Sequence, residues 1–276
     1  MNCGFIRCTV ILLLGTCFSI GGNSISIAQR SASVRQIIAH RGSSADRPEC
    51  TIASVRRAIE AGATATEVDV RTTKDRRLVI LHDATVDRTT DGTGLIGEKT
   101  LDEVKQLDAG GWFDPKYKDE RVPVLGEVFA VCNDKIDILL DLKEQGEEFA
   151  HAVAFLVKTK GQPRRTIVGV RSIEQAMLFR ELLPESRQLG LIRSPDDVEA
   201  YAQAGVETIR LWPKWLTDES LVGRVRDAGA TLHLNGTTGA VDEVGELLKH
   251  QPYSLSSDDP ARLVKTLRLL RNVEKP

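Results

Sequence analysis

Residues 65–83, with the sequence ATEVDVRTTKDRRLVILHD, decide the fold of this chain. Two apolar runs typical of β-strands, residues 65–70 and 78–81, are separated by only seven residues. Two parallel strands need a crossover of at least about ten to twelve residues, so this connection is too short for one. The polar residues between the runs are typical of a turn. We therefore predict that residues 78–81 return antiparallel to residues 65–70 as a hairpin.

The rest of the chain alternates strand-like runs with amphipathic helical stretches, without a repeat or a low-complexity linker. The other strand-like runs are residues 34–39, 136–142, 166–170, 188–192, 207–212, 231–235 and 253–257. The helical stretches are residues 51–61, 147–160, 173–183, 195–204, 219–228 and 241–249. Such alternation favours a parallel sheet covered by helices. Eight strands remain beside the hairpin strand, so we expect one α/β domain, a (β/α)8 TIM barrel over residues 34–270.

Residues 84–123 form a connection too long for an ordinary barrel loop. We predict that this segment is a small inserted subdomain over the active-site face, following the hairpin that carries His82. It has no long helical pattern. A short helix is predicted over residues 100–107, where Thr100 and Glu103 fit a capping box.

The first 28 residues are typical of a secretory signal peptide. Residues 1–7 carry one positive charge, residues 9–20 are apolar and uncharged, and residues 26–28 (Ser-Ile-Ala) resemble a cleavage signal. A dozen apolar residues are too few for a stable membrane span. We therefore expect a secreted or periplasmic protein from which residues 1–28 are removed. Lipid anchoring through Cys17, which follows Leu-Gly-Thr, is the alternative.

Composition excludes some classes of protein. The net charge is only −2 and no basic stripe with interleaved aromatic residues occurs, so nucleic acid is not an expected partner. Without the signal only Cys50 and Cys132 remain, so the chain is not a disulfide scaffold. Whether these two pair is open, and two separate small apolar residues is the preferred interpretation. The oligomeric state is also open.

Acidic side chains lie where two of the predicted strands end. Glu67 and Asp69 are two positions apart, so on a strand they point to the same side, and two like charges held together favour a bound cation. Asp141 and Lys143 repeat the two-residue spacing on a later strand. There Asp141 can supply a third oxygen ligand, and Lys143 can supply a positive charge for an anionic substrate. Three carboxylates without a histidine pair at metal-ligand spacing favour one Mg²⁺ or Ca²⁺ ion over Zn²⁺.

Two histidines also end strand-like runs. His40 is followed by Arg41 and Gly42, and His82 is followed by Asp83, which is placed to orient the imidazole. Two imidazoles beside a metal can serve as general base and general acid, and an arginine is a natural bidentate ligand of phosphate. The remaining histidines are interpreted as structural or surface residues: His151, His233 and His250.

In their order along the chain these residues resemble the glycerophosphodiester phosphodiesterase family, within the phospholipase C-like superfamily of TIM-barrel phosphodiesterases. The resemblance covers about Ile37 to Pro260. The motifs that carry it are His40-Arg41-Gly42, Pro48-Glu49, Glu67-Val68-Asp69-Val70, Thr73-Lys74-Asp75, His82-Asp83, Arg88-Thr89-Thr90, Gly92-Thr93-Gly94, Pro123-x-Leu125-x-Glu127 and Ser257-Asp258-Asp259-Pro260. It implies metal-dependent hydrolysis of glycerophosphodiesters to glycerol 3-phosphate and an alcohol.

The resemblance also implies a role for each site residue. The acid–base pair would be His40 and His82, and Glu49 would support the site from one shell out. The ligands of the divalent cation would be Glu67, Asp69 and Asp141, and the substrate phosphate would be held by Arg41 and Lys143.

The chain departs from the family pattern at four places. Asp141 stands where most members have Glu, Cys50 replaces Asn, Arg76 replaces a turn Gly, and Asn235-Gly236 replaces Trp-Thr. A shorter Asp141 should still bind metal, the Cys50 loop is expected to be looser, and Arg76 implies a different hairpin turn. The family's tryptophan lines the alcohol side of the substrate, so its absence leaves the leaving alcohol open. Trp212 or Trp215 could substitute for it.

Two other functions therefore remain. One is a lysophospholipase D or sphingomyelinase D-like phosphodiesterase of the same superfamily, which a long apolar groove beside the metal would favour. The other is a non-catalytic barrel that binds phospholipid headgroups. The complete set of His40, Glu67, Asp69, His82, Asp141 and Lys143 argues against the second function.

Overall fold

Eight parallel strands close into a barrel in the computed structural model, which describes Met1 and residues 25–273. The strands are β1 (Gln36–Ala39), β2 (Ala65–Thr72), β4 (Asp137–Leu142), β5 (Thr166–Val170), β6 (Arg187–Gly190), β7 (Thr208–Leu211), β8 (Thr231–Leu234) and β9 (Ser254–Ser257). Each pairs in parallel with its neighbours, and β1 joins β2 to β9, so the sheet has closed on itself. The predicted TIM barrel is confirmed.

The predicted hairpin is also present. Strand β3 (Leu78–Ile80) runs antiparallel to the far end of β2, with Val70 opposite Ile80. In the turn, Arg76 has a φ of 63°, the left-handed region that glycine enters most easily. The arginine therefore adopts a glycine-like conformation, with the strain that a side chain adds there, and the connection stays short.

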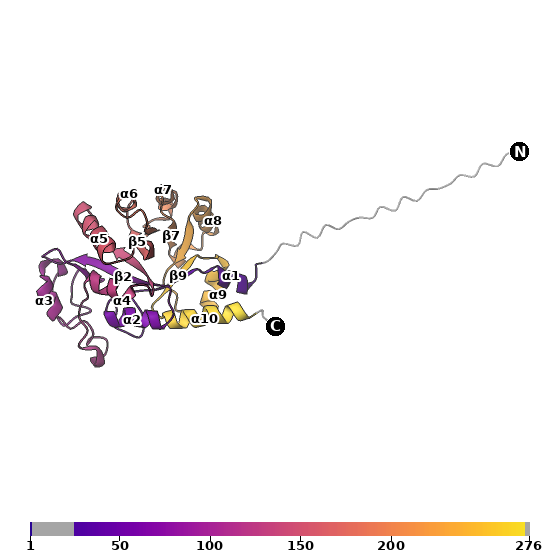
Figure 1. The fold of residues 1–276 in the computed structure, drawn as a ribbon. Helices are drawn as coiled ribbons and strands as arrows, with labels where there is room; N and C mark the ends of the chain where they lie inside the picture. The colour runs from indigo at the N-terminus through magenta and orange to yellow at the C-terminus, as the bar shows by residue number, and fades with distance from the viewer. Residues whose placement is uncertain (2–24, 274–276) are drawn as a thin grey trace.

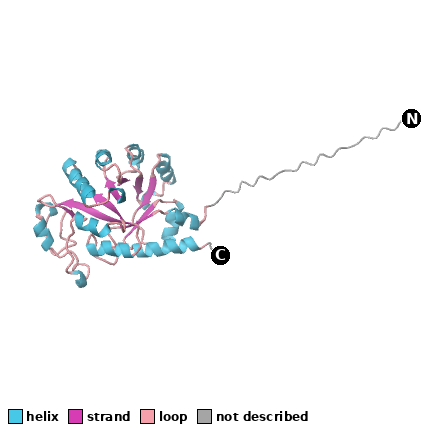
Figure 2. Cartoon of the chain, viewed as in Figure 1, coloured by secondary structure: helices cyan, strands magenta, loops and turns pink. Residues whose placement is uncertain are grey.

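One helix follows each barrel strand, and together these helices surround the sheet (Figures 1 and 2). They are α2 (Ile52–Glu60), α4 (Leu125–Cys132), α5 (Glu147–Thr159), α6 (Ile173–Leu182), α7 (Val198–Gln203), α8 (Glu219–Asp227), α9 (Val241–Lys249) and α10 (Pro260–Asn272). Helices α4 and α10 are absent from the sequence prediction. In α4, Ala130 and Val131 add apolar residues to the outer face and blur the helical period. Within residues 25–273, every helix is too short or too polar to span a bilayer.

A further unpredicted helix, α1 (Ile27–Ser33), precedes the barrel and packs on α10. Ser31 donates a hydrogen bond to the Leu267 carbonyl at 2.9 Å, and Arg271 donates to the Ser31 carbonyl. The predicted cleavage point after Ala28 falls in the first turn of α1. Residues 2–24 of the predicted signal, including Cys17, lie outside the described residues.

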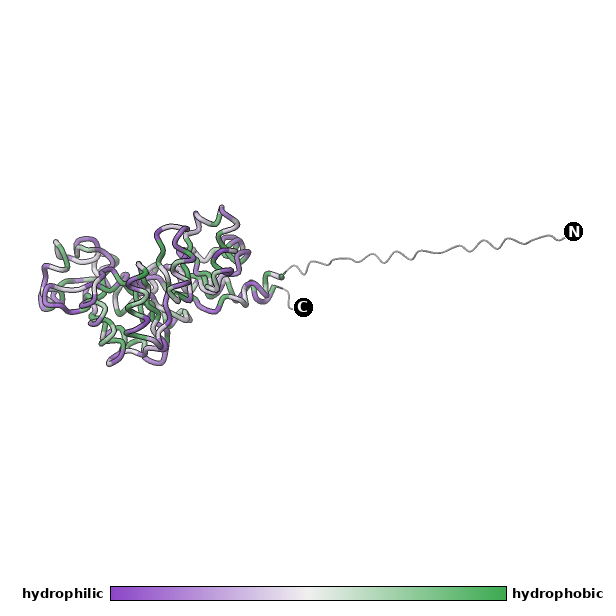
Figure 3. The backbone as a smooth tube through the Cα atoms, turned by 90° about the horizontal axis from the view of Figure 1, so that it is seen from above, coloured by the Kyte–Doolittle hydropathy of each residue, from purple (hydrophilic) through white to green (hydrophobic). Residues whose placement is uncertain are grey.

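Apolar side chains fill two layers. A small set fills the inside of the barrel: Ile38, Ala65, Leu139, Ile167, Leu189 and Leu191. A much larger set lies between the strands and the helices, and hydrophobic and hydrophilic stretches accordingly alternate along the chain (Figure 3). Burial of this apolar surface is the main stabilising contribution to such a fold.

The segment after the hairpin, residues 84–123, shares a small separate core with the hairpin strand. It contains Val79, Leu81, Val86, Ile96, Val104, Ala109 and Val122. Its helix α3 (Leu101–Gln106) lies beyond the end of β2 (Figure 1). Helix α3 begins with the predicted capping box: the Thr100 hydroxyl accepts from the Glu103 N–H, and the Glu103 carboxylate accepts from the Thr100 N–H.

Candidate active site

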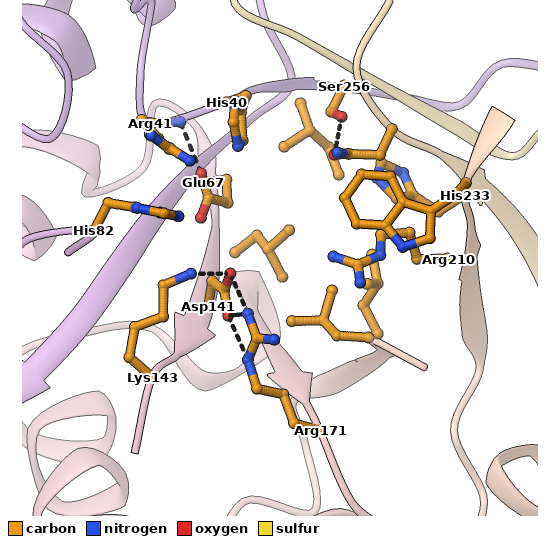
Figure 4. A pocket seen from close by; sticks show the side chains of 16 residues that line it. His40, Arg41, Glu67, His82, Asp141, Lys143, Arg171, Arg210, His233 and Ser256 are labelled. Carbon is orange, nitrogen blue, oxygen red and sulfur yellow. Dashed lines mark hydrogen bonds and ion pairs between the residues drawn. The ribbon is translucent and has the colours of Figure 1, made fainter. Parts of the chain in front are cut away.

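A cavity of about 340 Å³ opens at the carboxyl ends of the barrel strands. It brings together six of the residues expected from the sequence: His40, Arg41, Glu67, His82, Asp141 and Lys143 (Figure 4). Its other walls are formed by Ile38, Leu139, Arg171, Leu189, Leu191, Arg210, Trp212, His233, Asn235 and Ser256. Two expected residues, Asp69 and Glu49, lie behind the cavity wall and contact residues that line it.

The three carboxylates form one buried cluster. Strands β2 and β4 pair with Asp69 beside Asp141, and Glu67, Asp69 and Asp141 each offer an oxygen within 4.8 Å of the other two. Burial, reinforced by the charge of Asp69, raises the pKa of Glu67 to about 8. The Arg41 backbone N–H donates to Glu67 Oε2 at 2.7 Å and orients this carboxylate.

Two cations already pair with the other carboxylates. Lys143 Nζ lies 2.7 Å from both Asp69 Oδ1 and Asp141 Oδ2, so it bridges the two strands. Arg171 Nη2 lies 2.5 and 2.7 Å from the two oxygens of Asp141. Burial by itself would raise the pKa of Asp141, but these two cations outweigh it and hold the pKa below its usual value.

Arg171 was missed by the sequence interpretation. It directly follows β5, the same strand-end position that singled out the carboxylates, and this was the available signal. Its guanidinium holds Asp141, the residue that is one methylene shorter than the usual glutamate. Arg171 therefore keeps this shorter carboxylate in the cluster.

The donor set fits a hard divalent cation. All three groups offer oxygen, the donor atom that Mg²⁺ and Ca²⁺ prefer. Lys143 and Arg171 pair with Asp69 and Asp141, whereas among the described residues no lysine or arginine forms an ion pair with Glu67, whose pKa is raised by burial and by Asp69. A bound cation would supply the missing positive charge at this point.

Each of the two histidines is held through Nδ1 by a carboxylate. His40 Nδ1 lies 2.7 Å from Asp258 Oδ1, and His82 Nδ1 lies 2.8 Å from Asp83 Oδ1. Burial by itself would lower the pKa of His40, but the bond to Asp258 and the charge of Glu67 outweigh it and raise the pKa. With Nδ1 bonded, each ring has Nε2 left for proton transfer in the cavity.

The partner of His82 is itself held in place. Asp83 Oδ2 accepts from Arg88 Nε at 2.6 Å. This bond, assisted by His82 and opposed by partial burial, lowers the pKa of Asp83 to about 2. Asp83 was expected to orient His82, whereas the contact of Asp258 with His40 was not predicted.

Arg41 and Glu49 belong to one charged network. Arg41 Nη1 lies 2.9 Å from Glu49 Oε1, and Arg88 donates to both Glu49 oxygens at 2.8 and 2.9 Å. Burial by itself would raise the pKa of Glu49, but Arg88 and Arg41 outweigh it and lower the pKa. Glu49 thus joins the first strand end to the inserted segment.

The glycine after Arg41 has a steric reason. Gly42 has a φ of 79°, and a Cβ there would lie 2.3 Å from the Ser54 hydroxyl oxygen. Only glycine fits this close approach without a shift of the backbone. The turn it permits aims the Arg41 N–H at Glu67.

The other departures from the family pattern have visible structural consequences. Cys50 has a φ of 59°, a conformation that asparagine tolerates better than most residues, and its thiol donates to Asp69 Oδ2 at 3.3 Å. Cys50 and Cys132 are both buried and free, so they do not pair. Asn235 accepts from the Ser256 hydroxyl at 2.6 Å.

Of the two tryptophans, Trp212 lines the cavity and Trp215 packs against the core. His233, interpreted from sequence as structural or surface, lies in the cavity wall, where its Nδ1 is 2.8 Å from the Ser254 hydroxyl. His233 therefore has a structural hydrogen bond and also lines the cavity. The residues next to it in the sequence did not indicate the second role.

The fold is that of a TIM-barrel protein. At its rim two imidazoles, each bonded to a carboxylate, share one cavity with a cluster of acidic residues. Residues 40–234 match the model of the glycerophosphoryl diester phosphodiesterase family. The chain belongs to this family.

Relatives and solved structures agree with this assignment. A glycerophosphodiester phosphodiesterase of Caldanaerobacter subterraneus is 51% identical over 107 residues, 39% of this chain and 44% of that protein. One of Bacillus subtilis is 30% identical over 220 residues, 71% of this chain and 74% of that protein. The first of these matches therefore spans less than half of the relative.

Two similar solved structures are matched by this chain over almost their full length. An Oleispira antarctica phosphodiesterase, solved in complex with the product sn-glycerol-3-phosphate, is 27% identical with a TM-score of 0.78, over 87% of this chain and 99% of that chain. A glycerophosphodiester phosphodiesterase of Agrobacterium tumefaciens is 28% identical with a TM-score of 0.73, over 83% of this chain and 99% of that chain.

Proposed function

We propose that this protein hydrolyses glycerophosphodiesters to glycerol 3-phosphate and an alcohol, with His40 and His82 as acid–base pair and one Mg²⁺ or Ca²⁺ ion as cofactor. The observation that carries the proposal is the placement of two carboxylate-held imidazoles and the Glu67–Asp69–Asp141 cluster at one cavity. Family membership and the product bound in the Oleispira structure support the same reaction.

The residues divide the work as follows. One imidazole accepts a proton at Nε2 from the attacking water or substrate hydroxyl, and the other donates a proton to the leaving alkoxide oxygen. Asp258 and Asp83 fix the rings, because each occupies the opposite nitrogen. Arg41 and Lys143 offer positive charge to the phosphate. A divalent cation held by the carboxylate cluster would offset the negative charge that grows on the phosphate oxygens in the transition state.

Cavity size supports a small substrate. A volume of about 340 Å³ lies at the lower end of the range for ligand pockets. Apart from the Trp212 indole, its rim is formed by charged and polar side chains, and its aliphatic residues belong to the barrel interior. This favours a deacylated diester over lysophospholipid or sphingomyelin, whose chains would need an apolar groove.

The test compares three substrates with and without chelator: glycerophosphocholine, glycerophosphoglycerol and lysophosphatidylcholine. We expect chelator-sensitive turnover of the glycerophosphodiesters, and roughly a 10²-fold or greater loss in His40→Ala and in His82→Ala. The exposed His151 provides the matched control, since His151→Ala should leave activity unchanged.

Each contrary result has a distinct meaning. Turnover that resists chelation, or that survives both histidine substitutions, would refute the mechanism. Turnover of lysophosphatidylcholine alone would favour the lysophospholipase D alternative. Binding of diesters without turnover by the metal-loaded protein would favour a headgroup-binding barrel.

We also propose export with removal of residues 1–28. N-terminal sequencing of protein recovered from the periplasm or the medium should begin at Gln29. A lipidated N-terminus at Cys17 would support the anchored alternative, and retention of Met1 in the cell would contradict export.

A further inference from the structure

Arg210, on β7, is a cation that the proposed reaction does not use. Its guanidinium carbon lies 4.3 Å from the centre of the Trp212 ring, and its buried Nε has no hydrogen-bond partner. In the described part of the chain no carboxylate forms an ion pair with Arg210. By contrast, Lys143 and Arg171, in the same cavity, are both paired with Asp141.

The carboxylates of Asp141 and Glu67 act on Arg210 only beyond ion-pair distance, and a second cation, Arg171, acts on it as well. Burial, together with the charge of Arg171, lowers the pKa of Arg210 to about 10, so it remains charged at neutral pH. His233, beside it on β8, is neutral because burial and Arg210 lower its pKa to about 3. Of the lining residues that follow Asp141 and Lys143 in the sequence, two are arginines, Arg171 and Arg210, and none is a carboxylate.

The position of Arg210 separates it from the reacting phosphate. Figure 4 shows Arg210 across the cavity from His82 and next to His233, and the Trp212 ring packs on its guanidinium. His40, His82, Arg41 and Lys143 lie around Glu67 and Asp141 on the other side. A diester whose phosphorus sits between the two histidines therefore extends one of its substituents toward Arg210.

Its packing prepares Arg210 to bind an anion. The indole of Trp212 covers one face of the guanidinium, so its N–H edge is held rather than free to turn. A planar guanidinium with unused donors matches the two oxygens of a carboxylate or phosphate. Two neighbouring guanidiniums also repel each other, and an anion beside them relieves that repulsion.

We propose that Arg210 is a specificity-determining residue that binds a negatively charged group, a carboxylate or a phosphate monoester, on the leaving alcohol of the substrate. This inference rests on the proposed phosphodiesterase function and deepens it. Substrates with purely cationic alcohols, such as choline or ethanolamine, meet a guanidinium where they would need a carboxylate and are disfavoured.

Two matched substrate pairs test the inference. Glycerophosphoserine differs from glycerophosphoethanolamine by one carboxylate, and glycerophosphoglycerol phosphate differs from glycerophosphoglycerol by one phosphate. In the wild-type enzyme we expect kcat/KM to favour the anionic member by roughly 10- to 100-fold in at least one pair, the size of a charge-assisted hydrogen bond. The pair that shows the preference identifies the anion.

Variants assign the preference to this residue. Arg210→Gln should reduce the ratio within the preferred pair to a few-fold or less, and Arg210→Lys should keep part of it. The exposed Arg193, which does not line the cavity, supplies the matched control Arg193→Gln, with an unchanged ratio. Equal kcat/KM within both wild-type pairs overturns the inference. So does an Arg210→Gln variant that loses activity equally on all four substrates, because Arg210 would then contact the shared glycerol or phosphate.

Calorimetry separates this inference from the proposed function. Binding of the same four diesters is measured on the metal-loaded wild type and on His82→Ala. Tighter binding of the anionic members without turnover by the wild type contradicts the phosphodiesterase function and supports the role of Arg210 in binding. Turnover of all four diesters without a charge preference contradicts the inference alone.

Discussion

Replacing Asp258 by Asn should change both the rate and the pH dependence of the reaction, because this carboxylate holds the His40 imidazole. The bond from His40 Nδ1 to Asp258 Oδ1 is 2.7 Å long. A hydrogen bond between charged groups contributes about 1.5–3 kcal/mol, but the Asp258 side chain is 64% exposed, so solvent screening reduces this to about 1 kcal/mol.

The sign of the pH effect follows from the pair. Asp258 stabilises the protonated imidazole and raises the pKa of His40, so Asp258→Asn should lower that pKa. The limb of the pH–kcat/KM profile that reports His40 should therefore move to lower pH. A ring that is less well oriented should also lower kcat by about 10- to 100-fold, part of the full acid–base contribution.

Stability should respond in the same direction. Because the folded pKa of His40 lies above its ordinary value of 6.5, the pair stabilises the fold fully below about pH 6.5 and loses this effect as the pH rises through the folded pKa. Asp258→Asn should therefore lower the free energy of unfolding by about 1 kcal/mol at pH 6 and by less at pH 9.

The neighbouring residue supplies a control. Asp259 caps α10 by accepting from the Arg262 N–H at 2.9 Å, and asparagine is an equally good cap. Asp259→Asn should leave the pH profile and kcat unchanged. The reasoning is refuted if Asp258→Asn keeps the wild-type kcat and pH profile when both variants are assayed at the same metal concentration.

Three further outcomes are expected. Burial raises the pKa of Glu67 to about 8, so the protein kept free of metal by a chelator should lose stability as the pH rises from 5 to 8. Thermal melting with chelator should show this decrease, and both Glu67→Gln and added Mg²⁺ or Ca²⁺ should reduce it. Gly42→Ala should destabilise the protein by about 2 kcal/mol or more in urea unfolding, since its Cβ would clash with a neighbouring serine. The control Gly126→Ala, in an open helical position, should be neutral or stabilising. Equal effects of the two substitutions would contradict the steric argument. Glu49→Gln should lower the free energy of unfolding by about 2 kcal/mol, because two arginines lose a charged partner whose side chain is mostly buried. An unchanged urea midpoint would show that solvent screens this network.

Much of the fold was accessible from local patterns. The connection between residues 70 and 78 is too short for a crossover whatever surrounds it, so the hairpin and the number of barrel strands followed directly. Helix α4 was missed because its outer face also carries apolar residues. Helix α1 was missed because its one buried residue, Ser31, is polar and bonds to α10, which is more than 230 positions away.

The candidate site was accessible where residue type and strand end coincided. Glu67, Asp69, Asp141 and the two histidines satisfy this condition, and the structure brings all of them to one rim. Arg210 is likewise a charged residue within an apolar run. Unlike Glu67 with Asp69, it has no second charged residue two positions away that would have suggested a role. Its importance depends on which carboxylates reach it.

The sequence by itself determined the barrel, the hairpin and the strand-end carboxylates, because connection length and the two-residue period of a strand act over a few neighbouring residues. Only the tertiary structure decided that Asp258 holds His40 across 218 positions, that Arg171 secures Asp141, and that Arg210 is left unpaired. The physical reason is closure: pairing of β1 with β9 places distant strand ends on one rim. Competition among the charges on that rim then assigns each its partner.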